Sequence, residues 1–165
     1  MRSGCAPSVC EDAARSILPW LVVAIGLAAI GHLAWEAAQL PLYTLWSTGT
    51  SRAIGFALVH CTGGDVLIST ATLLMGGILA GLRGWHLFGS RMLVTVIGLG
   101  VAYTTLSEGL NVGIWRSWSY SSAMPVSPWL GIGLSPVLQW LVVPVIALGI
   151  TFGWRTILNS QTPRR

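Results

Sequence analysis

A histidine, a cysteine and an aspartate stand close together in "HCTGGDVLIST", residues 60–70, directly before a long apolar run. A second pair, His32 and Glu36, is four residues apart, which places both side chains on one face of a helix. Imidazole and carboxylate groups bind divalent metals, carry protons and hold cations. These residue types predict metal, proton or cation chemistry, provided that the fold brings the two stretches together.

Glu108 is a further acidic residue in an apolar setting, because "TTLSEGLNVGIW" continues apolar beyond it. A carboxylate inside or beside a membrane span is energetically unfavourable and is by default a candidate functional group. Pairing with Arg52 or Arg116 would instead satisfy it structurally. Tyr103 or Tyr120 could also donate a hydrogen bond to a carboxylate, although packing is the commoner use of tyrosine.

Each of these groups has a structural use as well. His32 and Glu36 could be polar residues that simply reach a membrane interface. Asp65 could cap the start of a helix, where its charge favours the helix dipole. Cys61 is more often a small buried apolar residue than a ligand. Residue types alone leave these structural alternatives open.

Composition indicates which elements position the candidate residues. The chain has 165 residues, of which 53% are hydrophobic and only 8% are charged. A soluble domain usually carries about 25% charged residues, so a chain this apolar is predicted to be a membrane protein in contact with the lipid bilayer. The basic residues are all arginine and form no stripe, which predicts no nucleic-acid partner.

Four segments are long enough to span a bilayer, which takes about 20 residues of helix. They run over 17–40, a charge-free core at 66–82, 92–110 and 135–154. The first is longer than the apolar part of a cleaved signal peptide and is expected to be retained. The fold class is therefore all-α, an antiparallel bundle of four transmembrane helices.

The same spans divide the chain into a tail at 1–16, a transmembrane domain at 17–157 and a second tail at 158–165. Residues 52–60 are expected to form an interfacial helix before the second span. Gly63 and Gly64 leave two arrangements open there. An unbroken helix puts His60 and Asp65 slightly off one face, whereas a break at the glycines lets both turn inward.

The arginines predict the orientation. With both termini cytoplasmic, the inner side carries Arg2, Arg15, Arg83, Arg91, Arg155, Arg164 and Arg165, and the outer side carries Arg52 and Arg116. This excess of inner arginines follows the positive-inside rule. The expected location is the inner membrane of a bacterium, with several passes.

With this topology the polar residues of all four spans meet near the outer end. Glu36 lies ~29 Å along a helix from Ile17, which is about the hydrocarbon thickness. The candidate ligand- or proton-binding residues are Glu36, Asp65, Glu108, Arg52, Arg116 and Gln139. The candidate metal ligands are His32, Glu36, His60, Asp65 and Glu108. If the charged groups share one layer, three acids face two arginines, and one carboxylate must bind a proton, a cation or a histidinium.

The connection between the last two spans is rich in aromatic, Ser, Gly and Pro residues, "NVGIWRSWSYSSAMPVSPWLGIGLSP". This composition predicts either a lid or re-entrant segment or a plain interfacial connection. Pro144 is expected to kink the fourth span.

The stretches "VHCTGGDVLI" and "SSAMPVSPWLGIGLSPVLQWLVVP" resemble segments of small multi-pass membrane proteins of bacteria whose activity is not characterised. The resemblance covers most of the chain after about Leu40. It implies a bacterial inner-membrane fold and carries no activity.

Together these features predict binding or transport of a cation, a proton or a small polar ligand at an outward-facing cluster of carboxylates and histidines. The alternatives are a membrane-embedded enzyme with a divalent metal and a redox subunit with haem on His32 and His60. A further alternative is an accessory subunit without chemistry, and association as a homo-oligomer or in a larger membrane complex stays open.

Overall fold

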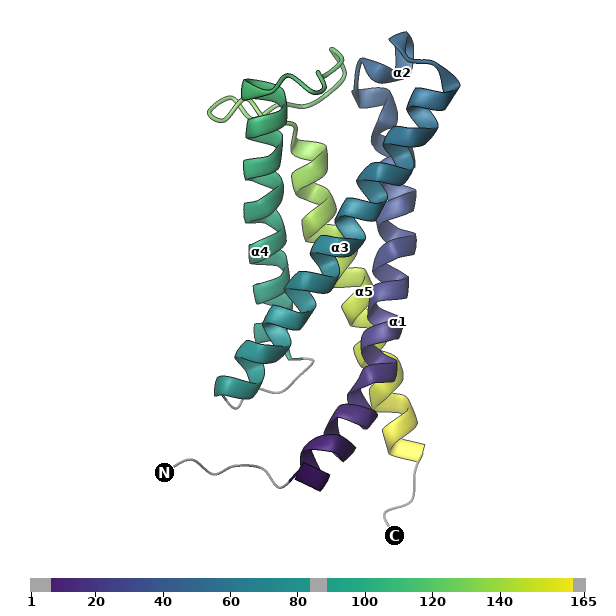
Figure 1. The fold of residues 1–165 in the computed structure, drawn as a ribbon, viewed down its shortest axis with the longest axis vertical. Coiled ribbons are helices and arrows are strands. Elements are labelled where there is room, and N and C mark those ends of the chain that lie inside the picture. The colour runs from purple at the N-terminus through teal and green to yellow at the C-terminus, as the bar shows by residue number, and fades with distance from the viewer. Residues whose placement is uncertain (1–6, 84–88, 162–165) are drawn as a thin grey trace.

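The structure, a computed structural model, describes residues 7–83 and 89–161, and in these ranges it consists of helices joined by loops (Figure 1). The long helices are α1 (Pro7–Gln39), α3 (Ser51–Arg83), α4 (Ser90–Glu108) and α5 (Leu134–Gln161). The short helical turns are η1 (Leu40–Leu42), α2 (Leu45–Thr48) and the π-helical turn η2 (Gly109–Ile114).

Each long helix contributes to a segment that is long and apolar enough to cross a membrane. These segments are Leu18–Leu42, Ser51–Leu79, Ser90–Ile114 and Leu134–Thr156. The prediction of an all-α bundle with four candidate spans is thus confirmed. The long helices themselves extend past the predicted spans, since α1 begins at Pro7 and α5 ends at Gln161.

Helix α3 corrects two expectations about the second span. It runs unbroken from Ser51 through Gly63 and Gly64, so residues 52–60 are the start of the spanning helix and form no separate interfacial helix. Asp65 lies inside this helix and therefore does not cap a helix start. An unbroken helix satisfies its own backbone hydrogen bonds, which a lipid environment requires.

The bundle has two different ends (Figure 1). Helix α1 starts and α5 finishes at one end, whereas α2 and the irregular loop 115–133 lie at the other, which we call the loop end. Helix α1 packs against α3 and α5, and α4 packs against the same two helices. Helices α3 and α4 approach each other away from the loop end and diverge toward it.

Away from the loop end the helices enclose an apolar core. Its buried members are Ala24, Leu73, Met92, Val96 and Leu148. Many large apolar side chains point outward instead, among them Val22, Leu67, Val94 and Ile146, each more than half exposed. An apolar outer surface on all four long helices is what a bundle surrounded by lipid requires.

Candidate functional site

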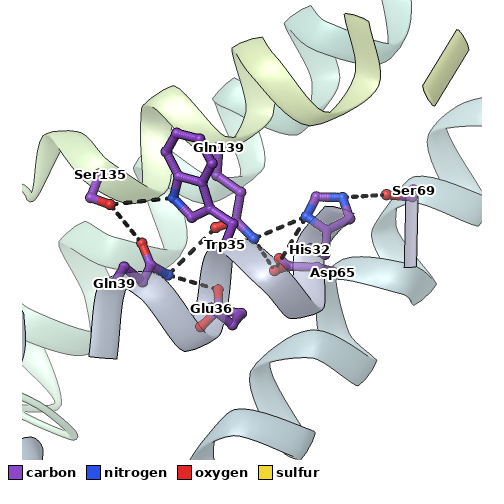
Figure 2. Close-up of polar contacts among 8 residues, drawn as sticks. All are labelled: His32, Trp35, Glu36, Gln39, Asp65, Ser69, Ser135 and Gln139. Atoms are coloured by element: carbon purple, nitrogen blue, oxygen red, sulfur yellow. Dashed lines mark hydrogen bonds and ion pairs between the residues drawn. The ribbon is translucent and has the colours of Figure 1, made fainter. Parts of the chain in front are cut away.

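Helix α1 presents a polar stripe to the interior near the loop end. His32, Glu36 and Gln39 follow one another at the spacing of one helix face, and their exposed fractions are 0%, 7% and 4%. Helix α5 opposes this stripe with Ser135 and Gln139, both buried. Polar side chains of α1, α3 and α5 therefore meet inside the bundle (Figure 2).

The side-chain amide of Gln139 lies at the centre of this polar network. Its Nε2 lies 2.9 Å from Nδ1 of His32 and 2.8 Å from Oδ2 of Asp65, and both N–H groups can donate. Its Oε1 accepts a long hydrogen bond of 3.5 Å from Gln39. Asp65 accepts from the amide nitrogen and Gln39 donates to the amide oxygen, so both partners agree with this orientation of the amide.

This orientation also fixes the tautomer of His32. Its Nδ1 accepts from Gln139, so the proton lies on Nε2, which donates to Oγ of Ser69 at 3.0 Å. The distance of 3.6 Å between Nδ1 and Oδ2 of Asp65 is too long for a hydrogen bond. His32 is thus a neutral imidazole whose two nitrogens both have partners, and its ring packs 5.0 Å from that of Trp140.

Two acidic residues, Glu36 of α1 and Asp65 of α3, belong to the same hydrogen-bond network around this amide (Figure 2). Glu36 accepts from Gln39 at 2.7 Å, and Gln39 in turn accepts from Ser135 at 2.9 Å. Two ionised carboxyl groups within one buried network repel each other.

Glu108 is a third acidic residue near the loop end and is the last residue of α4. The hydroxyl of Tyr120 donates to its Oε2 and accepts from the backbone N–H of Gly133 at 2.8 Å. The ring of Tyr43 lies 5.6 Å from that of Tyr120. Burial raises the pKa of both phenols, so each keeps its proton at neutral pH and remains a donor.

A cavity of about 310 Å³ lies between Glu108 on one side and Glu36 and Asp65 on the other. The carboxyl residues Glu36, Asp65 and Glu108 line it from three different helices. Its aromatic walls are Tyr43, Tyr103, Trp118 and Trp140. The buried indole nitrogen of Trp118 makes no hydrogen bond of normal geometry. Among the described residues no arginine lines the cavity, and the chain has no lysine.

Loop 115–133, which we call the lid, lies at the loop end (Figure 1), and its Trp118 lines the cavity. Thr44 donates its backbone N–H to the carbonyl of Ser119 at 3.0 Å, and Ser121 donates to Leu42 at 2.9 Å. An antiparallel bridge joins Tyr43 to Tyr120. These bonds hold the loop against the η1–α2 turn, and residues from both segments line the cavity.

The structure brings together five of the candidate residues, namely His32, Glu36, Asp65, Gln139 and Glu108. His60 lies on the rim of the cavity, where its exposed ring stacks 5.4 Å from that of Phe56. Arg52 and Arg116 are exposed, and neither forms an ion pair with a carboxylate in the described part of the chain. Of the partners considered for Glu108, an arginine or a tyrosine, the structure shows Tyr120.

The metal and haem hypotheses find little support in this geometry. Within residues 7–83 and 89–161, no group of three or more His, Cys, Asp and Glu side chains is arranged to hold a metal ion. His32 uses both ring nitrogens inside the protein, whereas His60 stands apart on the rim. The two histidines are therefore not arranged as an axial pair.

Four residues of the site were missed by sequence reasoning. Gln39 continues the stripe of His32 and Glu36 by one helical turn, and Ser69 follows Asp65 by one turn, so helical spacing could have found both. Tyr43 and Trp118 lie in non-helical segments, where no periodicity marks a residue that faces a cavity.

Comparisons with protein-family models, with curated proteins and with solved structures find no match to this chain. The resemblance to small multi-pass membrane proteins is therefore supported only by the four long apolar helices. The site must be interpreted from its own geometry.

Replacing Tyr120 by phenylalanine is expected to loosen the lid. The change removes the donor to Glu108 and the acceptor for Gly133 while keeping the ring. Loss of two hydrogen bonds should destabilise the lid by about 1–2 kcal/mol. Hydrogen exchange should then be faster at the Gly133 amide, whereas Tyr103→Phe, at a half-exposed position, should leave it unchanged. Equal exchange in all three proteins would contradict the proposed contact.

Proposed function

We propose that this chain is an integral membrane protein that binds a small cation in the cavity and serves its transport across the membrane. The observation that carries the proposal is the lining: three carboxyl residues from three helices, without a lysine or an arginine beside them in the described residues. Inside a low-dielectric bundle such a site attracts positive charge and repels anions.

The carboxyl pair supplies a means to bind a cation reversibly. Because two carboxylates that line one cavity repel each other, we infer that Glu36 and Asp65 hold one proton between them when no ligand is bound. A cation that approaches the pair favours the doubly ionised form and displaces this proton. Binding of the cation and release of the proton are thereby coupled, which is the exchange that a proton-linked transporter needs.

The arginine distribution supports an orientation for this site. We infer that both termini are cytoplasmic and that the loop end faces outward, because most arginines then lie on the inner side. The location that fits is the inner membrane of a bacterium. The cavity would then lie toward the outer side of the membrane.

Cation binding by the purified protein in lipid nanodiscs tests the proposal. Sodium, potassium and methylammonium ions would be titrated while thermal unfolding is followed. We expect at least one of them to raise the melting temperature, because a ligand that binds the folded state stabilises it. Asp65→Asn and Glu36→Gln should each weaken this binding about tenfold or more, which corresponds to about 1.4 kcal/mol.

Glu11→Gln provides a matched control. Glu11 belongs to the same helix as Glu36 but lies at its opposite end, so its loss should leave binding unchanged. Cations that stabilise all four proteins equally would show that the effect is unspecific and that the cavity is not the site. An anion that binds more tightly than any cation would also contradict the proposal.

A further inference from the structure

Exposed side chains mark one side of the cavity at the level of the membrane. Half of its lining residues come from α3 and α4, the two helices that diverge toward the loop end (Figure 1). The lining side chains that are exposed on these helices are His60 of α3 and Tyr103 of α4. Both lie inside the segments that can span the membrane, Ser51–Leu79 and Ser90–Ile114. The rim between them therefore faces lipid.

Entry at the loop end would pass through the lid. The lid, loop 115–133, is fastened to the η1–α2 turn by the hydrogen bonds of Thr44 and Ser121 and by the Tyr43–Tyr120 bridge. A ligand that enters through the lid must open these contacts. A ligand that passes between His60 and Tyr103 leaves them intact.

The lining combines two kinds of surface. The acids lie deep, since Glu36 and Glu108 are 7% and 5% exposed, whereas Tyr103 at the rim is 52% exposed. Apolar side chains of Ala57 and Ile68 line the same wall of α3. An amphiphile with a cationic head matches this gradient, because the head reaches the acids while the chain stays against apolar side chains and lipid.

We propose that the ligand is a membrane-dissolved alkylammonium amphiphile that reaches the cavity laterally between α3 and α4. This inference rests on the proposed function and names the class of cation. A cavity of about 310 Å³ accommodates the head and the first carbons of the chain, at the lower end of the range for ligand pockets. The rings of Tyr103 and Trp118 also favour an ammonium ion through cation–π contacts.

Quenching of tryptophan fluorescence in nanodiscs tests this inference. The probe is dodecylammonium brominated on its chain near the head, because bromine quenches nearby tryptophans and both Trp118 and Trp140 line the cavity. Butylammonium, which lacks the long chain, is tested as a competitor. We expect saturable quenching by the probe, and at least tenfold weaker competition by butylammonium than by unbrominated dodecylammonium.

Two adjacent glycines provide a steric test that leaves the charges unchanged. Gly64 lines the cavity and Gly63 does not, and neither has an atom within 4 Å of the position of an added Cβ. Gly64→Leu should fill the cavity and abolish saturable quenching, whereas Gly63→Leu should retain it. Asp65→Asn should shift half-saturation about tenfold upward, and Glu11→Gln should not.

The results of these binding tests distinguish a failure of the lateral-amphiphile inference from a failure of the proposed function. If butylammonium competes as well as dodecylammonium, or if only inorganic cations bind, the lateral amphiphile is wrong and cation binding stands. If neither ammonium nor any inorganic cation binds, the proposed function itself is wrong. Quenching that is unsaturable or equal in Gly64→Leu and the unsubstituted protein would show partition into lipid only and would overturn the inference.

Discussion

Substitution of Gly100 by alanine is expected to lower the free energy of unfolding by about 3 kcal/mol. A Cβ at this position would lie 2.0 Å from Cε3 of Trp140, far inside van der Waals contact. Trp140 cannot move aside easily, because it is 1% exposed and packs against His32. Insertion of a methyl group into a filled core costs about 1–3 kcal/mol, and this contact is at the severe end.

Unfolding of the detergent-solubilised protein, followed by circular dichroism, measures this effect. Gly98→Ala is the matched control, since it is on the same helix and has no atom within 4 Å of the added Cβ. The control should change stability by less than about 1 kcal/mol. Equal stability of the two variants would mean that α4 and Trp140 do not pack as described.

Replacing Gln139 by leucine is expected to destabilise the protein by about 2–3 kcal/mol. The change keeps the volume but removes the donor to His32 and to Asp65 and the acceptor for Gln39. Each buried polar group left without a partner costs about 1–3 kcal/mol, although hydrogen bonds between membrane helices average less, about 0.6 kcal/mol. The loss of three hydrogen-bond partners together gives the expected destabilisation of about 2–3 kcal/mol.

The same unfolding measurement serves here, with Leu138→Met as the control on the exposed side of α5. The control should be nearly neutral. If Gln139→Leu were as stable as the control, the polar network would add nothing to the packing of α1, α3 and α5. Cation binding should weaken in Gln139→Leu as well, because Asp65 loses the amide that orients it.

The four candidate spans could be predicted from the sequence because they depend on composition and length alone. The continuity of α3 could not, since glycine pairs such as Gly63 and Gly64 break a helix in water more readily than in lipid, where an unsatisfied backbone is costlier. The sequence therefore indicated the number of helices better than their ends.

Part of the site was also predictable. Alternating direction of the helices brings Glu36, Asp65, Glu108 and Gln139 toward one end, and the structure places all four on one cavity. Which partner each acid has could not be predicted. Glu108 uses Tyr120, twelve residues further along an irregular loop, in preference to the nearer Arg116, because the loop folds back over the cavity.

Calorimetric titration of one binding cation, carried out in two buffers with different ionisation enthalpies, tests the central claim most directly. The carboxyl pair of Glu36 and Asp65 predicts that about one proton leaves for each cation bound near neutral pH, and that Glu36→Gln and Asp65→Asn release none. Cation binding with no proton release in the unsubstituted protein, or with the same release in both variants, would contradict the account.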